Sequence, residues 1–452
     1  MTSSASDVAA PSADGRADRL GDRRIAVALA YTALLVCFVI TNFTNDVILQ
    51  KVRLVLGKKP DWPEPALRHM RFVASDHYTQ YLLASVKDAA FFVCLVVLGF
   101  LIRTAAMSLW PAIKQRTLWI NPLIGFCIAS IFILQIQTAG MGETYAQVSI
   151  DPFLQHTGMY YRRILMPVLA HDLHLAGVLY GFFYWGVVLI VLALVSIYVG
   201  TKGLTLSKLE LASLCTVGSF ATGLGLPGYP ELLVLGFTLL AMLDFEHRGR
   251  AGISQLVLFG LALLTHESAA VLSFGVMALC LFDRRFLIHF LALLSLYVLI
   301  WLLSFSFDVQ AAARTQTVVI ANNAMQYQGN LPHALLSIPM AYKFMLIVAA
   351  AAVALLAVAG DYRKAAFIVL AIAGGAATTY VAVDYSRVVS FGTFGVIVAL
   401  PVVLTRLSQR QRLGLALANL MTPTIYISIH AGIWPYRGLY GLVLARVFHL
   451  HV

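Results

Sequence analysis

Repeated apolar runs of about 20 residues dominate this chain, and that is the length that an α-helix needs to cross the hydrocarbon core of a membrane. Of its 452 residues, 60% are hydrophobic and 12% are charged, whereas ordinary soluble domains carry about 25% charged residues. The sequence therefore predicts an all-α polytopic membrane helix bundle with about 13 transmembrane helices. The expected spans lie near residues 25–43, 89–106, 121–138, 174–199, 209–224, 229–245, 253–265, 269–283, 286–306, 338–359, 364–383, 388–405 and 412–431.

The positions of basic residues give the orientation, because Lys and Arg accumulate in short cytoplasmic loops. With a cytoplasmic N-terminus, every second connection should be basic. The connections placed inside hold Arg103, Lys114 and Arg116; Lys202 and Lys208; Arg248 and Arg250; Arg284 and Arg285; Arg363 and Lys364; and Arg406, Arg410 and Arg412. We therefore predict a multi-pass protein of a bacterial inner membrane. A disordered cytoplasmic segment, 1–24, precedes a single transmembrane domain, 25–452, with outer loops near 44–86, 139–173 and 307–337.

Two apolar stretches are predicted to be broken into short helices. The 31 residues 253–283 are too many for one span and too few for two full ones, and one span would place every later basic connection outside. Two shortened helices that meet at Thr265 to Ser268 keep every second connection basic. The glycines and prolines of GLGLPGYPE divide the stretch 209–245 into two helices in the same way. Short helices must end within protein or at a water-filled cavity. Glu231, His266 and Glu267 are therefore expected to line an outward-opening pocket.

The outer loops are expected to carry amphipathic helices that lie at the membrane interface. In loop 44–86, the segment PALRHMRFVASDHYTQYLL places apolar and polar side chains on opposite helical faces. In loop 139–173, a second such helix should follow Tyr161, with Ile164, Leu165, Val168 and Leu169 as its apolar side.

Ionisable residues gather at the predicted outer face, where they indicate a site or a pathway. Carboxylates in a partly desolvated cavity are suited to act as a general base on a hydroxyl. Arginines beside them offer paired donors to a phosphate. The same residues fit a transporter for an anionic solute equally well. Two further alternatives are purely structural: an ion pair of Glu267 with a residue on another helix, and an ion pair between Asp384 and Arg387, which are close in the sequence.

The order of the motifs resembles the GT-C class of polytopic glycosyltransferases. The resemblance rests on GETYAQ, YYRRILMP, GYPELLVL, LTHESAAVL and DYSRVVSF, between about residues 120 and 405. It implies transfer of a sugar from a polyprenyl-phosphate donor at the outer leaflet, with Glu143 as the base and Arg162, Arg163 and Arg387 holding the donor phosphate. In this class the acidic loop usually follows the first helix, so Asp46 or Asp76 is an alternative to Glu143.

We therefore expect a membrane glycosyltransferase acting on a cell-envelope acceptor. The alternatives are a transporter or flippase for an anionic or lipid-linked solute, and a scaffold in polysaccharide assembly. The candidate catalytic residues are Glu143, Glu267 and His266, and the candidate substrate-binding residues are Arg162, Arg163, Asp384, Arg387, Glu231 and Asp76. No cofactor is predicted; a divalent metal ion stays open as an alternative, although no metal-ligand spacing supports one. The net charge of +11 is spread over short clusters between apolar runs, which indicates contact with membrane lipids rather than nucleic acid.

Overall fold

A computed structural model describes residues 117–133, 141–152, 163–304, 331–380, 382, 384–428, 432–436 and 439–440. Within these residues the chain is almost entirely helical, which confirms the all-α prediction. The predicted segment 1–24, the spans 25–43 and 89–106, loop 44–86 and residues 305–330 of the third outer loop lie outside the described residues.

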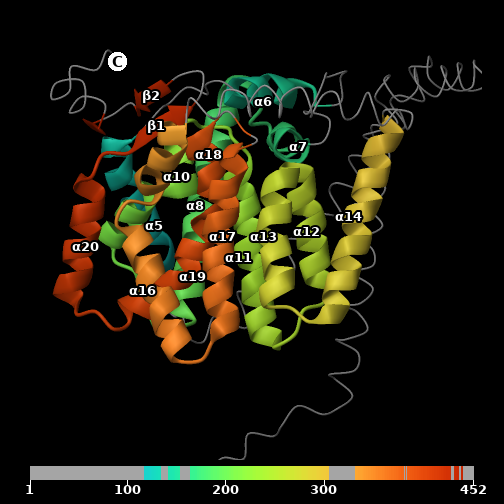
Figure 1. Cartoon of the computed structure of the whole chain (residues 1–452). Coiled ribbons are helices and arrows are strands. Elements are labelled where there is room, and N and C mark those ends of the chain that lie inside the picture. Colours follow the sequence, from blue (N-terminus) through green and yellow to red (C-terminus); the bar gives the residue numbers. More distant parts are fainter. Residues whose placement is uncertain are drawn as a thin grey trace, which may run out of the picture.

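The helices form one bundle whose long members run between two ends (Figure 1). In chain order they are α5 (Thr117–Phe132), α6 (Met141–Ile150), α7 (Leu165–Asp172), η3 (Gly177–Leu179), α8 (Tyr180–Gly200), α9 (Lys208–Cys215), α10 (Gly218–Gly225), α11 (Glu231–Arg248), α12 (Ile253–Thr265), α13 (Glu267–Cys280), α14 (Arg284–Ser304), the helix Leu331–Tyr342, α16 (Met345–Val358), α17 (Tyr362–Ala377), η4 (Thr378–Tyr380), α18 (Tyr385–Val389), η5 (Ser390–Gly392), α19 (Thr393–Leu404) and α20 (Gln409–Met421). A hairpin of β1 (Ile425–Ser428) and β2 (Gly432–Pro435) follows, with Ile425 opposite Pro435.

The described residues contain two helices that are long and apolar enough to cross a membrane. They are Gly177–Gly200 and Tyr385–Leu404, and a third exists if Leu331–Tyr342 and Met345–Val358 are counted as one bent span. Shorter apolar helices, among them Ile253–Thr265 and Glu267–Cys280, lie beside them. These lengths suit a membrane protein in which several helices stop short of a full crossing.

The two broken stretches are interrupted at the predicted positions. Residues 253–283 form α12 and α13, which meet at His266, and 209–245 divides where α10 ends at Gly225 and α11 begins at Glu231. His266 has extended backbone dihedrals, and its Nδ1 accepts a hydrogen bond from the Ala269 amide, so it also caps α13. The helix expected after Tyr161 is α7.

Three sequence expectations for the spans are wrong in detail. The expected span 412–431 ends as a helix at Met421 and continues into β1, because Pro423 cannot donate a helical hydrogen bond. The expected span 338–359 is bent by 81° between Tyr342 and Met345. The expected span 209–224 is two helices, α9 and α10, rather than one.

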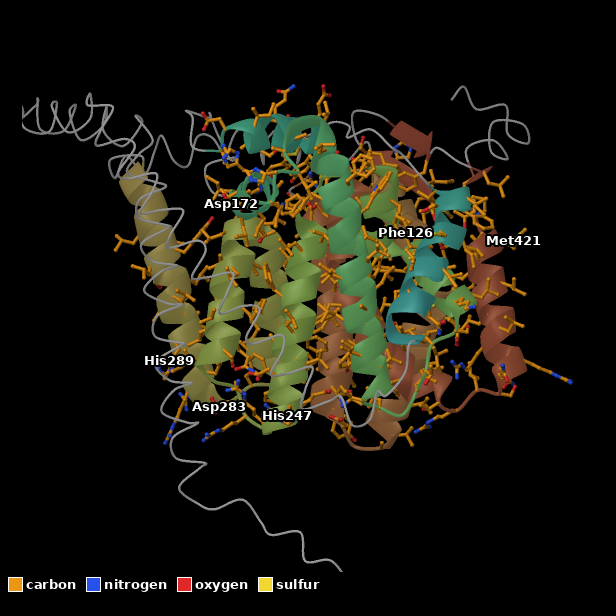
Figure 2. All side chains as sticks on the ribbon, turned by 180° about the vertical axis from the view of Figure 1, so that it is seen from behind. Phe126, Asp172, His247, Asp283, His289 and Met421 are labelled. Atoms are coloured by element: carbon orange, nitrogen blue, oxygen red, sulfur yellow. The ribbon has the colours of Figure 1, made fainter. Side chains whose placement is uncertain are left out.

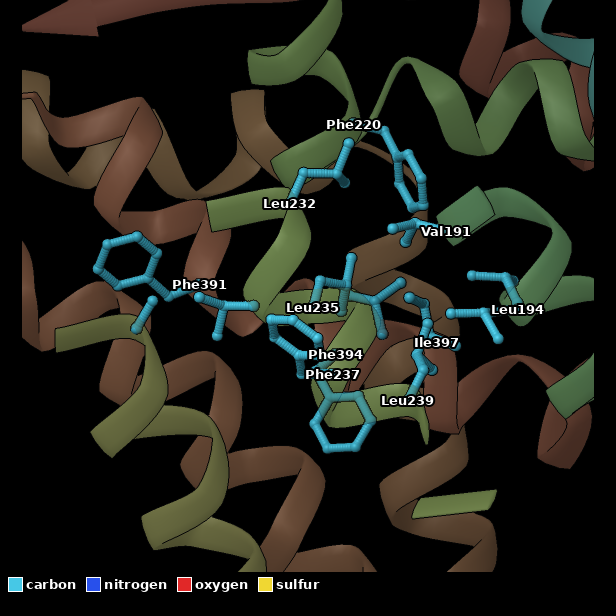
Figure 3. Close-up of a cluster of buried hydrophobic side chains, with 14 of the residues drawn as sticks. Val191, Leu194, Phe220, Leu232, Leu235, Phe237, Leu239, Phe391, Phe394 and Ile397 are labelled. Atoms are coloured by element: carbon cyan, nitrogen blue, oxygen red, sulfur yellow. The ribbon is translucent and has the colours of Figure 1, made fainter. Parts of the chain in front are cut away.

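The interior is apolar and close-packed where α8, α10, α11 and α19 meet. Figure 3 shows a cluster of buried side chains there, with Val191 and Leu194 of α8, Phe220 of α10, Leu235 and Phe237 of α11, and Phe394 and Ile397 of α19. Large apolar side chains also cover parts of the outer surface, among them Ile131, Leu279, Ile347 and Val358. A helix that is apolar on both its inner and outer faces is typical of a membrane environment.

The two ends of the bundle differ in charge. The connections α8–α9, α11–α12, α13–α14, α16–α17 and α19–α20 lie at one end and carry the basic residues expected inside, so we name it the basic end. There Arg363 donates to the carbonyl oxygens of Cys280 and Phe282 at 2.8 and 3.1 Å and so satisfies the C-terminus of α13. The opposite end, which we name the site end, carries α6, α7, α18 and the hairpin. Figure 2 shows Asp172 near the site end and His247 and Asp283 near the basic end.

Candidate functional site

Six of the residues that the sequence singles out lie close together at the site end. Each stands at the end of a helix: Arg163 two residues before α7, Glu231 at the start of α11, His266 between α12 and α13, Glu267 at the start of α13, Asp384 directly before α18, and Arg387 within α18. The broken helices place Glu231, His266 and Glu267 here, because each break turns a helix end into the bundle instead of its outer surface.

Glu231 is the centre of this cluster. It is 5% exposed, and its Oε1 lies 3.2 Å from Nε of Arg387 and 3.5 Å from Nε2 of His266. Neither carboxylate oxygen accepts a hydrogen bond of good geometry from another residue that the structure describes. A buried carboxylate in this state has lone pairs available for a donor group from water or a ligand.

His266 presents a defined ring nitrogen to Glu231. Its Nδ1 accepts the Ala269 amide at 3.3 Å, so the proton of the neutral ring belongs on Nε2, which faces Glu231. The ring also packs edge-on against Phe391, with the centroids 5.4 Å apart. The helix cap therefore fixes both the orientation and the tautomer of the imidazole.

Arg387 is held from three sides. Its Nη1 lies 3.4 Å from Oδ2 of Asp384 and 3.2 Å from the sulfur of Met141, and its guanidinium lies 5.0 Å from the centre of the Tyr229 ring. The expected ion pair of Asp384 with Arg387 is thus present. The contacts with Asp384 and Glu231 are longer than an ideal charge-assisted hydrogen bond, so Arg387 keeps donors that a ligand anion could take.

Arg163 makes the tightest pair of the cluster. Its Nε and Nη2 donate to the two oxygens of Glu267, both at 2.9 Å, and the side chains are 9% and 16% exposed. The guanidinium also lies against the hydroxyl of Tyr145 on α6. Burial raises the pKa of Tyr145 to about 12 although Arg163 opposes the shift, so this hydroxyl stays protonated. The pair ties the segment before α7 to α13 beside His266.

Of the other predicted site residues, the structure describes Glu143, which is not part of this contact network. Glu143 lies in the first turn of α6 and is exposed, and no described residue forms an ion pair or hydrogen bond with its carboxylate. Arg162 and Asp76 lie outside the described residues. Three contact residues of the cluster were not predicted individually from the sequence: Tyr145, Tyr229 and Met141. The first two belong to the motifs GETYAQ and GYPELLVL.

The cluster contains three carboxylates and two guanidiniums, with a histidine between them. Because Arg163 is already bound bidentately, Arg387 is the guanidinium better able to bind an anion. Among the described residues, no group of three or more His, Cys, Asp or Glu side chains has the geometry to hold a metal ion. The arrangement suits proton transfer at Glu231 next to a cationic group.

A close backbone contact holds α6 over the cluster. A Cβ at Gly142 would lie 2.2 Å from the carbonyl oxygen of Pro227, and Gly228 has a φ of +108°, which only glycine adopts readily.

We expect Gly142→Ala to destabilise the protein by about 1–3 kcal/mol, the usual cost of overpacking, as measured by thermal unfolding in detergent. Gly186→Ala is the control, because a Cβ at Gly186 meets nothing within 4 Å. Equal stability of the two variants would contradict the contact.

No protein-family model matches this chain, and neither does any curated protein or solved structure. The function of the buried charges therefore follows from their own geometry and chemistry.

Proposed function

We propose that this protein is a membrane glycosyltransferase that moves a sugar from a polyprenyl-phosphate-linked donor to a cell-envelope acceptor. The observation that carries the proposal is Glu231, a buried carboxylate between His266 and Arg387 whose oxygens accept no well-formed hydrogen bond from the other described residues. A carboxylate in this environment is a competent base for a hydroxyl and lies beside a cation that would stabilise a phosphate. The bundle, in this proposal, has about 13 transmembrane helices with the site end outside.

In the proposed reaction, the acceptor oxygen forms a bond with the anomeric carbon of the sugar. The bond from that carbon to the phosphate oxygen breaks, and its electron pair leaves with the polyprenyl phosphate. The acceptor proton passes to Oε2 of Glu231, because Oε1 lies on the side that faces His266 and Arg387. Arg387 faces the phosphate charge that develops. Arg163 and Glu267 act by holding α7 and α13 in place.

A transporter for the same lipid-linked solute is the second candidate. The cluster forms where two pairs of interrupted helices meet, α10 with α11 and α12 with α13, and secondary transporters build their binding sites from interrupted helices. The carboxylates of the cluster also outnumber its arginines, which suits a site that takes up and releases protons.

The test adds a panel of polyprenyl-phosphate sugars, labelled in the sugar, to native membranes that contain the protein. A glycosyltransferase moves the label to an envelope product and releases polyprenyl phosphate. Label that crosses the bilayer on the intact donor identifies a transporter. The absence of both events indicates a scaffold.

We expect Arg387→Gln to lower transfer about 10²-fold, the usual effect of losing one charge-stabilising donor, and Arg250→Gln at the basic end to leave it unchanged. Full activity of Arg387→Gln would contradict its assigned role.

A further inference from the structure

A second buried charge lies apart from the cluster, at the bend between the helix Leu331–Tyr342 and α16. Lys343 is 8% exposed and has a φ of +50°, which is unusual for a residue with a side chain. No carboxylate of the described residues pairs with it. Its Nζ lies instead 3.1 Å from Oγ1 of Thr216, 3.3 Å from the carbonyl oxygen of Asn419 and 3.4 Å from the hydroxyl oxygen of Tyr440. We name these three oxygens the Lys343 cage.

Every oxygen of the cage presents a lone pair to Lys343. The hydroxyl proton of Thr216 is donated to the carbonyl of Ser213 at 2.8 Å, and that of Tyr440 is donated to the carbonyl of Leu420. The third oxygen, of Asn419, is a carbonyl and can only accept. The three acceptors match the three N–H donors that a lysine side chain has as an ammonium.

The cage has the composition of a site for a monovalent cation. Its ligands are neutral oxygens, and the face of the Tyr440 ring lies 4.8 Å from Nζ, which adds a cation–π contact. Interrupted helices that turn carbonyl oxygens inward form cation sites in other membrane proteins.

We propose that the Lys343 cage is a monovalent-cation site whose occupant is the chain's own ammonium, and that a small alkylammonium ion binds there once the side chain is removed. The bound cation joins four chain segments: the break between α9 and α10, the bend before α16, the end of α20 and the segment that carries Tyr440. It also supports the site end, because the neighbouring Tyr342 donates a hydrogen bond to the carbonyl of Val389 in α18, the helix that carries Arg387.

The test compares melting temperatures of the full-length protein in detergent at constant ionic strength. We expect Lys343→Ala to melt about 5 °C lower than the wild type, and propylammonium chloride, the fragment that the substitution removes, to restore part of this loss. Choline chloride, whose cation is too bulky for the cage, should restore none. Lys202→Ala at the basic end is the control and should not respond to propylammonium. An unchanged melting temperature of Lys343→Ala, or equal rescue by choline, would overturn the proposal.

A second measurement does not depend on the folding of that variant. Thr216→Val and Tyr440→Phe each remove one cage oxygen with little change in side-chain volume. Each should lower the melting temperature, and their combination should lower it by less than the sum because both oxygens bind one ammonium. Additive effects, or none, would count against a shared cation. Because the readout is stability, neither result depends on whether the protein transfers a sugar.

Discussion

Glu231→Gln is expected to reduce sugar transfer by about 10²–10⁴-fold, the contribution of a general base. Glutamine keeps the size of the side chain and its contacts with His266 and Arg387, but it cannot accept the proton of the acceptor hydroxyl. The rate is measured with the labelled polyprenyl-phosphate donor, and the melting temperature is measured in parallel to show that the variant folds.

Glu246→Gln is the matched control for this variant. Glu246 lies on the same helix, α11, but near the basic end, where it pairs with Lys202 at 2.7 Å. The same chemical change there should leave the transfer rate within about twofold of the wild type, since Glu246 lies at the opposite end of α11 from Glu231. Wild-type transfer by a folded Glu231→Gln protein would remove Glu231 from the mechanism.

Separating Arg163 from Glu267 is expected to have the largest effect on stability. Glu267→Gln and Arg163→Met each leave a buried charge without its partner, and such a loss costs about 3–5 kcal/mol. The double variant Arg163→Met/Glu267→Gln should be less destabilised than the sum of the two, because its second substitution removes the stranded charge. Chemical unfolding in detergent measures all four proteins of the cycle.

The pair of Lys202 with Glu246 provides the comparison for that cycle. Its side chains are 32% and 19% exposed, against 9% and 16% for Arg163 and Glu267. A coupling energy of at most about 1 kcal/mol is expected for the more exposed pair. If the two cycles gave equal coupling energies, Arg163 and Glu267 would not be holding α7 against α13.

The broken helices could be predicted from the sequence because they follow from counting. The stretch 253–283 has the wrong length for one or two full spans. The connections before and after it are both basic, so an even number of helices must lie between them. His266 and Glu267 were placed at a helix junction by this reasoning, and α12 and α13 meet there.

The pairing within the cluster could not be predicted in this way. The resemblance of the motif order to the GT-C class made Glu143 the leading base. The helical period of α6 instead turns Gly142, Tyr145, Ala146 and Ser149 inward and leaves Glu143 exposed. Glu231 became central only through its distances to His266 and Arg387, which join segments more than 30 residues apart.

Lys343 was missed because one charge does not interrupt the hydropathy of residues 338–359. The bend beside Lys343 could not be predicted either, because no glycine or proline lies between Tyr342 and Met345. Its partners are a threonine, a tyrosine and a backbone carbonyl from distant segments, and none of these residue types signals a partner for a cation in a sequence.

Every proposal under the proposed function depends on which end of the bundle faces outside, and thiol labelling tests this sidedness most directly. In a protein whose five cysteines have been replaced, single cysteines are introduced as Glu143→Cys at the site end and Arg250→Cys at the basic end, both exposed positions. A membrane-impermeant maleimide is applied to right-side-out and inverted vesicles. We predict labelling of position 143 only in right-side-out vesicles and of position 250 only in inverted ones. The reverse pattern would place the buried carboxylates at the cytoplasmic face and contradict the account.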